Sequence, residues 1–177
     1  MRYANDLTFK LIAPEDAAEL LIFETAERDW FEQHIEARPE HFYTLEGITQ
    51  HIVECLELNA QRRMSPLLIR DKGVMIGRAN LRDMHSGQGK VGYRIAQQAS
   101  GQGIAQRALQ HLISEARSVY RLHTLTAIVS LENGASRYVL EKAGFEVAET
   151  LPAYSLVGAR RLDCVVYKRS ISSHKRV

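Results

Sequence analysis

The chain has 177 residues, a length that fits one domain with a sizeable hydrophobic core. Its apolar fraction of 45% and charged fraction of 25% are ordinary for a globular protein, and a net charge of +2 is too small to indicate nucleic-acid binding. There is no signal-peptide pattern or bilayer-spanning apolar run, and Cys55 and Cys164 lack the spacing of a metal site. We therefore expect a cytoplasmic, single-domain protein with no bound metal and no membrane or nucleic-acid partner.

The first third of the chain has mainly helical patterns. Residues 7–12 alternate as a first strand does, and Pro14 with the two acids after it favours the start of a helix. Apolar residues at helical spacing then predict helices in three places: from Pro14 to about Phe23, around Trp30 to Ile35, and over residues 44–59.

From Pro66 onward, strand patterns dominate. Residues 67–70 and 74–81 flank Asp71-Lys72-Gly73, which predicts a hairpin, and the polar residues 82–90 predict a loop. Further strands are expected over residues 91–96, 124–130, 145–150 and 162–167, the last two joined by a loop that contains Pro152, Tyr154 and Gly158. This order of elements predicts an α/β protein whose sheet is covered by helices.

The most informative stretch is Gln98-Ala99-Ser100-Gly101-Gln102-Gly103, which lies between a predicted strand and an amphipathic helix over residues 106–120. Two glycines let the backbone turn sharply, and the unpaired amides and dipole at a helix N-terminus attract phosphate. The loop lacks the third glycine of the dinucleotide fingerprint and the lysine of the nucleotide P-loop. On its own it is either a tight turn or a cradle for some other phosphorylated ligand.

A second segment about thirty residues later makes the pattern specific. Asn133-x-x-Ser136, followed by Leu140-Glu141-Lys142-x-Gly144-Phe145, indicates a short helix with a glycine at its C-terminus. At this spacing the two segments together resemble the cofactor segments of the GNAT N-acetyltransferases. Ser136, with Leu140 where many members have tyrosine, is similar to the RimJ/RimL branch, the ribosomal-protein N-terminal acetyltransferases. The resemblance covers nearly the whole chain and is strongest over residues 90–145.

The resemblance implies a fold and an activity. The fold is a mixed, mostly antiparallel, twisted sheet of six to seven strands, splayed at the strand before the Gly101/Gly103 loop, with helices on both faces. Residues 1–65 would form a helical portion on the substrate side, 66–168 the acetyl-CoA-binding core and 169–177 a basic tail. The expected reaction moves an acetyl group from acetyl-CoA to a primary amine, either a protein N-terminus or a small amine, by direct attack in a ternary complex. Family members are often dimers, which leaves a homodimer open.

The resemblance also assigns site residues. Ser136 would protonate the leaving thiolate, with Tyr138 as the next candidate, although Ser136 also fits an ordinary serine in the first helical turn. Asn133 would contact the pantetheine arm, cap the helix, or do both. The full set expected to bind acetyl-CoA is Tyr93, Arg94, Ile95, Gln98, Gly101, Gln102, Gly103, Ile104, Ala105, Asn133 and Ser136.

The general base and the function class are left open by the sequence. Lys90 stands where the family often has glutamate, and no carboxylate stands about ten residues beyond Phe145, where some relatives have a candidate base. An N-terminal amine has a pKa of about 8, so water could suffice as base. Two other functions remain: a non-catalytic acyl-CoA-binding module and a nucleotide-binding regulator. The candidate bases are Glu32, His34, Asp83, His85, Glu149 and Tyr154.

Overall fold

A computed structural model describes residues 6–172. In this part of the chain, seven strands form one sheet in the order β1-β2-β3-β4-β5-β7-β6, and every neighbouring pair is antiparallel except β4 and β5. The predicted mixed, mostly antiparallel sheet is confirmed. The strands are β1 (Leu7–Leu11), β2 (Ser65–Asp71), β3 (Val74–His85), β4 (Gln88–Ile95), β5 (Thr124–Ser130), β6 (Glu146–Val157) and β7 (Arg160–Ser170).

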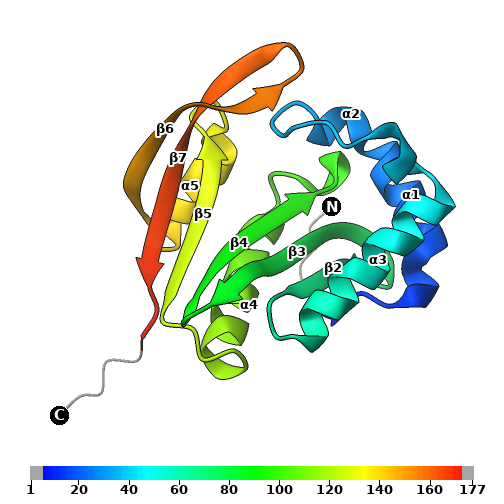
Figure 1. The fold of residues 1–177 in the computed structure, drawn as a ribbon, viewed down its shortest axis with the longest axis horizontal. Coiled ribbons are helices and arrows are strands. Elements are labelled where there is room, and N and C mark those ends of the chain that lie inside the picture. The colour runs from blue at the N-terminus through cyan, green and yellow to red at the C-terminus, as the bar shows by residue number, and fades with distance from the viewer. Residues whose placement is uncertain (1–5, 173–177) are drawn as a thin grey trace.

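The sheet is splayed between its two parallel strands. β4 and β5 pair only where they begin, from Gln88 opposite Thr124 to Lys90 opposite Thr126. Beyond Lys90 the strands diverge, as Figure 1 shows, while β4 stays paired with β3 as far as Ile95. The second half of β4 therefore has a strand partner on one side only, which confirms the predicted splay before the glycine loop.

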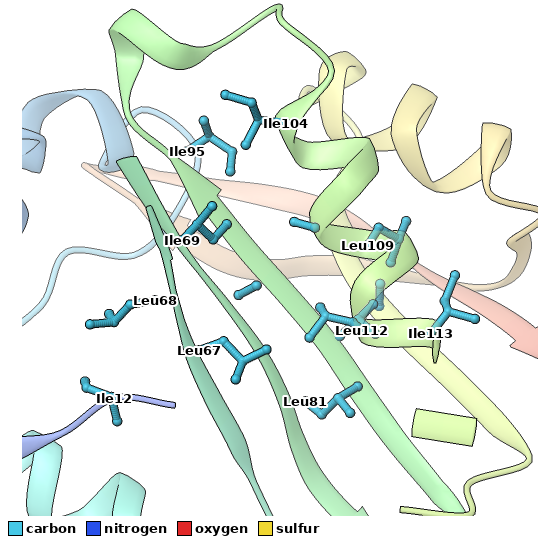
Figure 2. Packing of buried hydrophobic residues seen from close by; sticks show 14 of the residues in the cluster. Ile12, Leu67, Leu68, Ile69, Leu81, Ile95, Ile104, Leu109, Leu112 and Ile113 are labelled. Carbon is cyan, nitrogen blue, oxygen red and sulfur yellow. The ribbon is translucent and has the colours of Figure 1, made fainter. Parts of the chain in front are cut away.

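Helices cover both faces of the first four strands. α1 (Ala17–Ala26) and α3 (Leu45–Ala60) pack on one face with the short α2 (Arg28–Phe31), and α4 (Ile104–Ser118) packs on the other beside α5 (Gly134–Lys142). Figure 2 shows this division, with Leu67 and Leu81 directed toward α4 and Leu68 directed away from it. Single turns complete the set: η1 (Pro14–Asp16), η2 (Glu40–Tyr43) and η3 (Gln97–Ala99).

The packing of the amphipathic helix α4 on the sheet fixes the position of the glycine loop. Its buried residues recur at helical spacing and pack against the sheet, as the sequence predicts (Figure 2). Burying a leucine or isoleucine contributes about 1.5–3 kcal/mol, so this helix is held firmly and its N-terminus is fixed beside the end of β4. The residues of this stripe are Ile104, Ala108, Leu109, Leu112, Ile113 and Ala116.

Two segments predicted as loops form hairpins in the structure, so both predictions are wrong. Residues 82–90 are strand except for a turn at Ser86 and Gly87, whose φ angles of 47° and 74° suit a tight hairpin connection. The loop predicted between residues 150 and 162 is also mostly strand. β6 runs on to Val157, with a register shift between Leu151 and Ser155 that absorbs Pro152. A proline is tolerated there because β6 is an edge strand.

The end of the described chain belongs to the sheet. β7 continues to Ser170, the Arg169 guanidinium donates to the carbonyl of Ala143 at 2.6 Å, and Ile171 is buried. The expected basic tail therefore does not begin at residue 169, and Lys175 and Arg176 lie outside the described residues.

Candidate active site

The glycine loop between β4 and α4 leaves open space beside its backbone. Gly101 and Gly103 have left-handed backbone angles, with φ of 72° and 77°, which residues with a Cβ rarely adopt. Gly103 is the N-cap of α4, and no atom outside the adjoining residues lies within 4 Å of where a Cβ on either glycine would stand. A bound group can therefore approach this backbone without meeting a side chain.

The backbone amides at the start of α4 donate no hydrogen bond within the described part of the protein. The N–H of Arg107 donates to the carbonyl of Gly103 and that of Ser100 to Gln97, both at 3.1 Å. Between these two positions, no residue in the range 6–172 accepts a hydrogen bond from the amides of residues 101–106. Unbonded amides at the positive end of a helix dipole form an anion site, so this loop fits a diphosphate group.

The other residues predicted in this loop have different surroundings. The Gln102 side-chain amide donates to the carbonyl of Gln98 at 2.9 Å, so it folds back along the loop. Ile104 is buried in the core at 1% exposure, and Ala105 is half-buried. Ile104 can therefore contact a ligand through its backbone amide but not through its side chain.

The backbone of β4 alternates between β3 and the splay. The N–H of Ala96 donates to the carbonyl of Ile76 at 2.9 Å, and hydrogen-bonded pairs alternate along an antiparallel ladder. Arg94 therefore pairs with β3, whereas the N–H and C=O groups of Tyr93 and Ile95 point into the splay. The Ile95 carbonyl accepts a hydrogen bond from the indole of Trp30 at 3.1 Å. The structure thus separates Arg94 from the other two residues predicted in this strand.

The second predicted segment lies across the splay from β4. Asn133 caps α5, since its side-chain oxygen accepts a hydrogen bond from the amide of Ser136 at 3.2 Å. The Tyr93 hydroxyl donates to the carbonyl of Ser136 at 3.5 Å, which joins the two segments. Burial raises the pKa of Tyr93 to about 12, so this hydroxyl is protonated at neutral pH. Tyr138 is 64% exposed, with the Lys142 ammonium 5.9 Å from the centre of its ring.

The face of β4 that is covered by α1 carries a buried cluster of charged side chains, which the sequence analysis does not predict. Glu24 of α1 is 1% exposed and accepts from Arg78 at 2.6 Å and from Arg94 at 3.2 Å. Arg78 also contacts Nε2 of His51 at 2.8 Å. Burial, with Arg78 nearby, lowers the pKa of His51 to about 3, so His51 is neutral. The bonded partners are 27 to 70 positions apart in sequence, and no local motif joins them.

The candidate bases are spread over the molecule. Asp83 forms an ion pair with Lys90 at 3.1 Å near the turn between β3 and β4, and His85 ends β3 at this turn. Both lie at the closed end of the splay, where β4 pairs with β5. Glu32 follows α2 and accepts from Arg28 at 3.0 Å.

Three further candidate bases belong to the α2–η2 segment or to β6. Glu149 is an exposed residue of β6, and Tyr154 is 52% exposed within the register shift of that strand. His34 lies in the segment between α2 and η2, which meets the β6–β7 hairpin where the amide of Leu156 donates to Glu36 at 2.9 Å. Figure 1 shows the two elements approaching each other above the splay.

A family model described as an acetyltransferase (GNAT) domain matches residues 6–146. The chain belongs to the GNAT acetyltransferase family. A curated relative, the probable N-acetyltransferase YjcK of Bacillus subtilis (strain 168), is 32% identical over 136 residues, which are 73% of this chain and 75% of that protein. This GNAT protein is therefore an N-acetyltransferase with acetyl-CoA as its cofactor, and membership does not support the alternative of a non-catalytic module.

Solved structures show the same fold. The ribosomal-protein-S5-alanine acetyltransferase from Vibrio fischeri superposes with a TM-score of 0.91 at 21% identity, covering 96% of each chain. RimJ of Mycobacterium smegmatis, solved with a CoA disulfide, gives a TM-score of 0.85 at 22% identity, covering 93% of this chain and 81% of that one. The predicted GNAT fold, with RimJ/RimL enzymes as structural neighbours, is thereby confirmed.

Within residues 6–172, no helix is long and apolar enough to cross a membrane, and no group of histidine, cysteine and acidic side chains could hold a metal ion.

Proposed function

We propose that this GNAT acetyltransferase acetylates the α-amine at the N-terminus of a protein, by direct attack in a ternary complex. The observation that carries the proposal is the open glycine loop, whose unbonded amides lie at the end of the splayed strand. The structural neighbours support the choice of acceptor, since they include enzymes named for the alanine of ribosomal protein S5 and for the α-amine of L7/L12.

The residues present fit acetyl-CoA. The amides of residues 101–105 would bind the diphosphate, and Gln98 and Gln102 would line its path. The backbone groups of Tyr93 and Ile95 would pair with the pantetheine arm, with the Asn133 side chain on the far side of the splay. When bound, acetyl-CoA supplies an acetyl group activated as a thioester.

The chain's own groups would polarise the thioester and move the protons. An N–H of β4 that points into the splay can donate to the thioester oxygen, and one such donor typically lowers a barrier by ~3 kcal/mol. Ser136, in the first turn of α5, would hold the proton for the leaving sulfur, with Tyr138 as the second candidate. Because an α-amine has a pKa of about 8, water can take its proton without a dedicated carboxylate.

A covalent route through cysteine is disfavoured. Cys55 and Cys164 are both buried, and burial raises the pKa of each thiol. A thiolate nucleophile needs the opposite environment, with a lowered pKa and access to the substrate. Two unpaired thiols also fit the proposed cytoplasmic location. A homodimer stays a prediction, which sedimentation of the pure protein tests.

The proposal is tested by mixing the pure protein with acetyl-CoA and a panel of peptides with free N-termini. Release of free thiol should depend on the peptide, and mass spectrometry should find one acetyl group on its α-amine. The same peptides with a blocked N-terminus and an internal lysine are the control and should not react. Binding of coenzyme A without turnover on any amine would contradict the proposal, and preferential binding of ATP would favour a nucleotide-binding regulator instead.

The Ser136→Ala substitution should lower kcat about 100-fold and leave the dissociation constant of acetyl-CoA within threefold, because a positioned proton donor contributes at least that much. Steady-state kinetics and calorimetry measure the two effects. Ser118→Ala is the control, because its exposed hydroxyl donates to the carbonyl of Ser114 at the far end of α4. A normal kcat in Ser136→Ala, with a large loss in Tyr138→Phe, would assign the proton to Tyr138 instead.

A further inference from the structure

On the face of β4 opposite α4, two arginines bind one carboxylate and a third lies close by. Glu24 binds Arg78 and Arg94, and the Arg38 guanidinium lies against the ring of Phe42, whose centre is 5.3 Å from that of His51. His51 is neutral, so the group carries three positive charges against one negative charge. The Nε atom of Arg38 is buried and has no hydrogen-bond partner among the described residues.

The other acidic side chains nearby do not neutralise this excess of positive charge. Glu32 and Glu40 both bind Arg28, and Glu40 is 82% exposed. Glu36 accepts from the amide of Leu156. Unpaired charge in a poorly solvated site is costly, so a surplus of guanidinium groups favours binding of an anion.

Two of the arginines are held against aromatic rings and remain partly exposed to solvent. The Arg38 guanidinium lies 4.3 Å from the centre of the Phe42 ring, and that of Arg94 lies 5.1 Å from the centre of the Phe31 ring. Rings behind a guanidinium fix its plane and leave its edge free for a carboxylate. Both side chains reach solvent, since Arg94 is 24% exposed and Arg38 is half-buried.

The position of Arg94 relates this cluster to the acceptor. Arg94 stands between Tyr93 and Ile95, whose backbone groups point into the splay, and its side chain projects to the face covered by α1 and α2. This face lies opposite α4 and the glycine loop, so an amine that entered the splay from it would approach away from the diphosphate site. An extended peptide advances about 3.3–3.6 Å per residue, so a side chain one or two residues after the amine would reach Arg94.

We propose that Arg38 and Arg94 form a carboxylate subsite for the acceptor, which selects amines that carry a negative charge one or two residues from the reacting nitrogen. The inference rests on the proposed N-acetyltransferase function. Arg78 and Glu24 support the subsite by holding Arg94. The carboxylate is either an acidic side chain near a peptide N-terminus or the α-carboxylate of a free amino acid.

The test measures kcat/KM on C-terminally amidated Ala-Asp-Ala-Ala and Ala-Ala-Asp-Ala, each against its asparagine counterpart, and on alanine against alaninamide. Wild-type protein should prefer one acidic partner by 10-fold or more, since a charge-assisted pair is worth that factor. Arg38→Gln and Arg94→Gln should each bring the preference to within threefold of unity, with the KM for acetyl-CoA unchanged for Arg38→Gln. Arg63→Gln, at the exposed turn after α3, is the control and should keep the wild-type preference.

A peptide preference places the carboxylate on a side chain, and a preference for alanine over alaninamide places it on a free amino acid. Equal rates within every pair would overturn the subsite while leaving the acetyltransferase in place. If no amine is acetylated, the proposed function fails, and calorimetry with acetyl-Ala-Asp-Ala-Ala and its asparagine counterpart then tests the subsite alone. Equal affinity for these two would overturn it.

Discussion

Replacing Gly103 with alanine should weaken acetyl-CoA binding by 10-fold to 100-fold and change the stability of the protein only slightly. The residue has φ of 77°, so a Cβ costs about 1 kcal/mol of backbone strain, which lowers Tm by about 2–4 °C in a chain of this size. The Cβ meets no other part of the protein, but it would enter the space where the diphosphate approaches the amides. Calorimetry with coenzyme A and a thermal melt measure the two effects separately.

Gly158→Ala is the matched control. Gly158 has φ of 61° in the turn between β6 and β7, and it too has no atom within 4 Å of a would-be Cβ outside the adjoining residues. It should therefore show the same small loss of Tm with unchanged affinity for coenzyme A. Equal affinities for Gly103→Ala and wild-type protein would mean that the cofactor does not lie against this backbone, and the assignment of the loop would fall.

The features that the sequence predicts correctly are local ones. The glycine loop and the capping of α5 by Asn133 each depend on residues a few positions apart, and the buried stripe of α4 depends on the short spacing between successive apolar residues. Strand β5 is predicted over the residues that form it, because β-branched side chains are dense there. The splay came from resemblance to a family, since no local pattern encodes where two strands stop pairing.

The features that the sequence misses depend on contacts between distant segments. Residues 82–90 are polar and contain two glycines, yet they form a hairpin because pairing with the opposite strand overrides their composition. Arg94 appears in sequence as one residue of a cofactor-binding strand. Only its ion pair with Glu24 of α1, 70 positions away in sequence, shows that its side chain belongs to the opposite face. Glu24 lies in an apolar helix pattern, where nothing local distinguishes a buried ion-pair partner from a surface acid.

The Glu24→Gln substitution should lower the free energy of unfolding by about 3–5 kcal/mol, the cost of leaving buried charges without their partner. Glutamine keeps the shape of the side chain but removes the carboxylate that Arg78 and Arg94 share. Urea unfolding at pH 7 measures the loss. Glu19→Gln is the control on the same helix, because the ion pair of Glu19 with Arg70 is 45% exposed on the glutamate side and should contribute at most about 1 kcal/mol.

The loss of unfolding free energy in Glu24→Gln should also depend on pH. Burial alone would raise the pKa of Glu24, but Arg94 and Arg78 outweigh it, and the net pKa lies below the usual value of 4.5. The carboxylate therefore stabilises the fold fully above about pH 4.5, and this stabilisation is lost as the pH falls toward the lowered pKa. The difference between wild type and Glu24→Gln should shrink over that range. A difference below 1 kcal/mol at pH 7 would mean that the arginines find solvent or another anion without Glu24, and Arg94 would then not be held in place by α1.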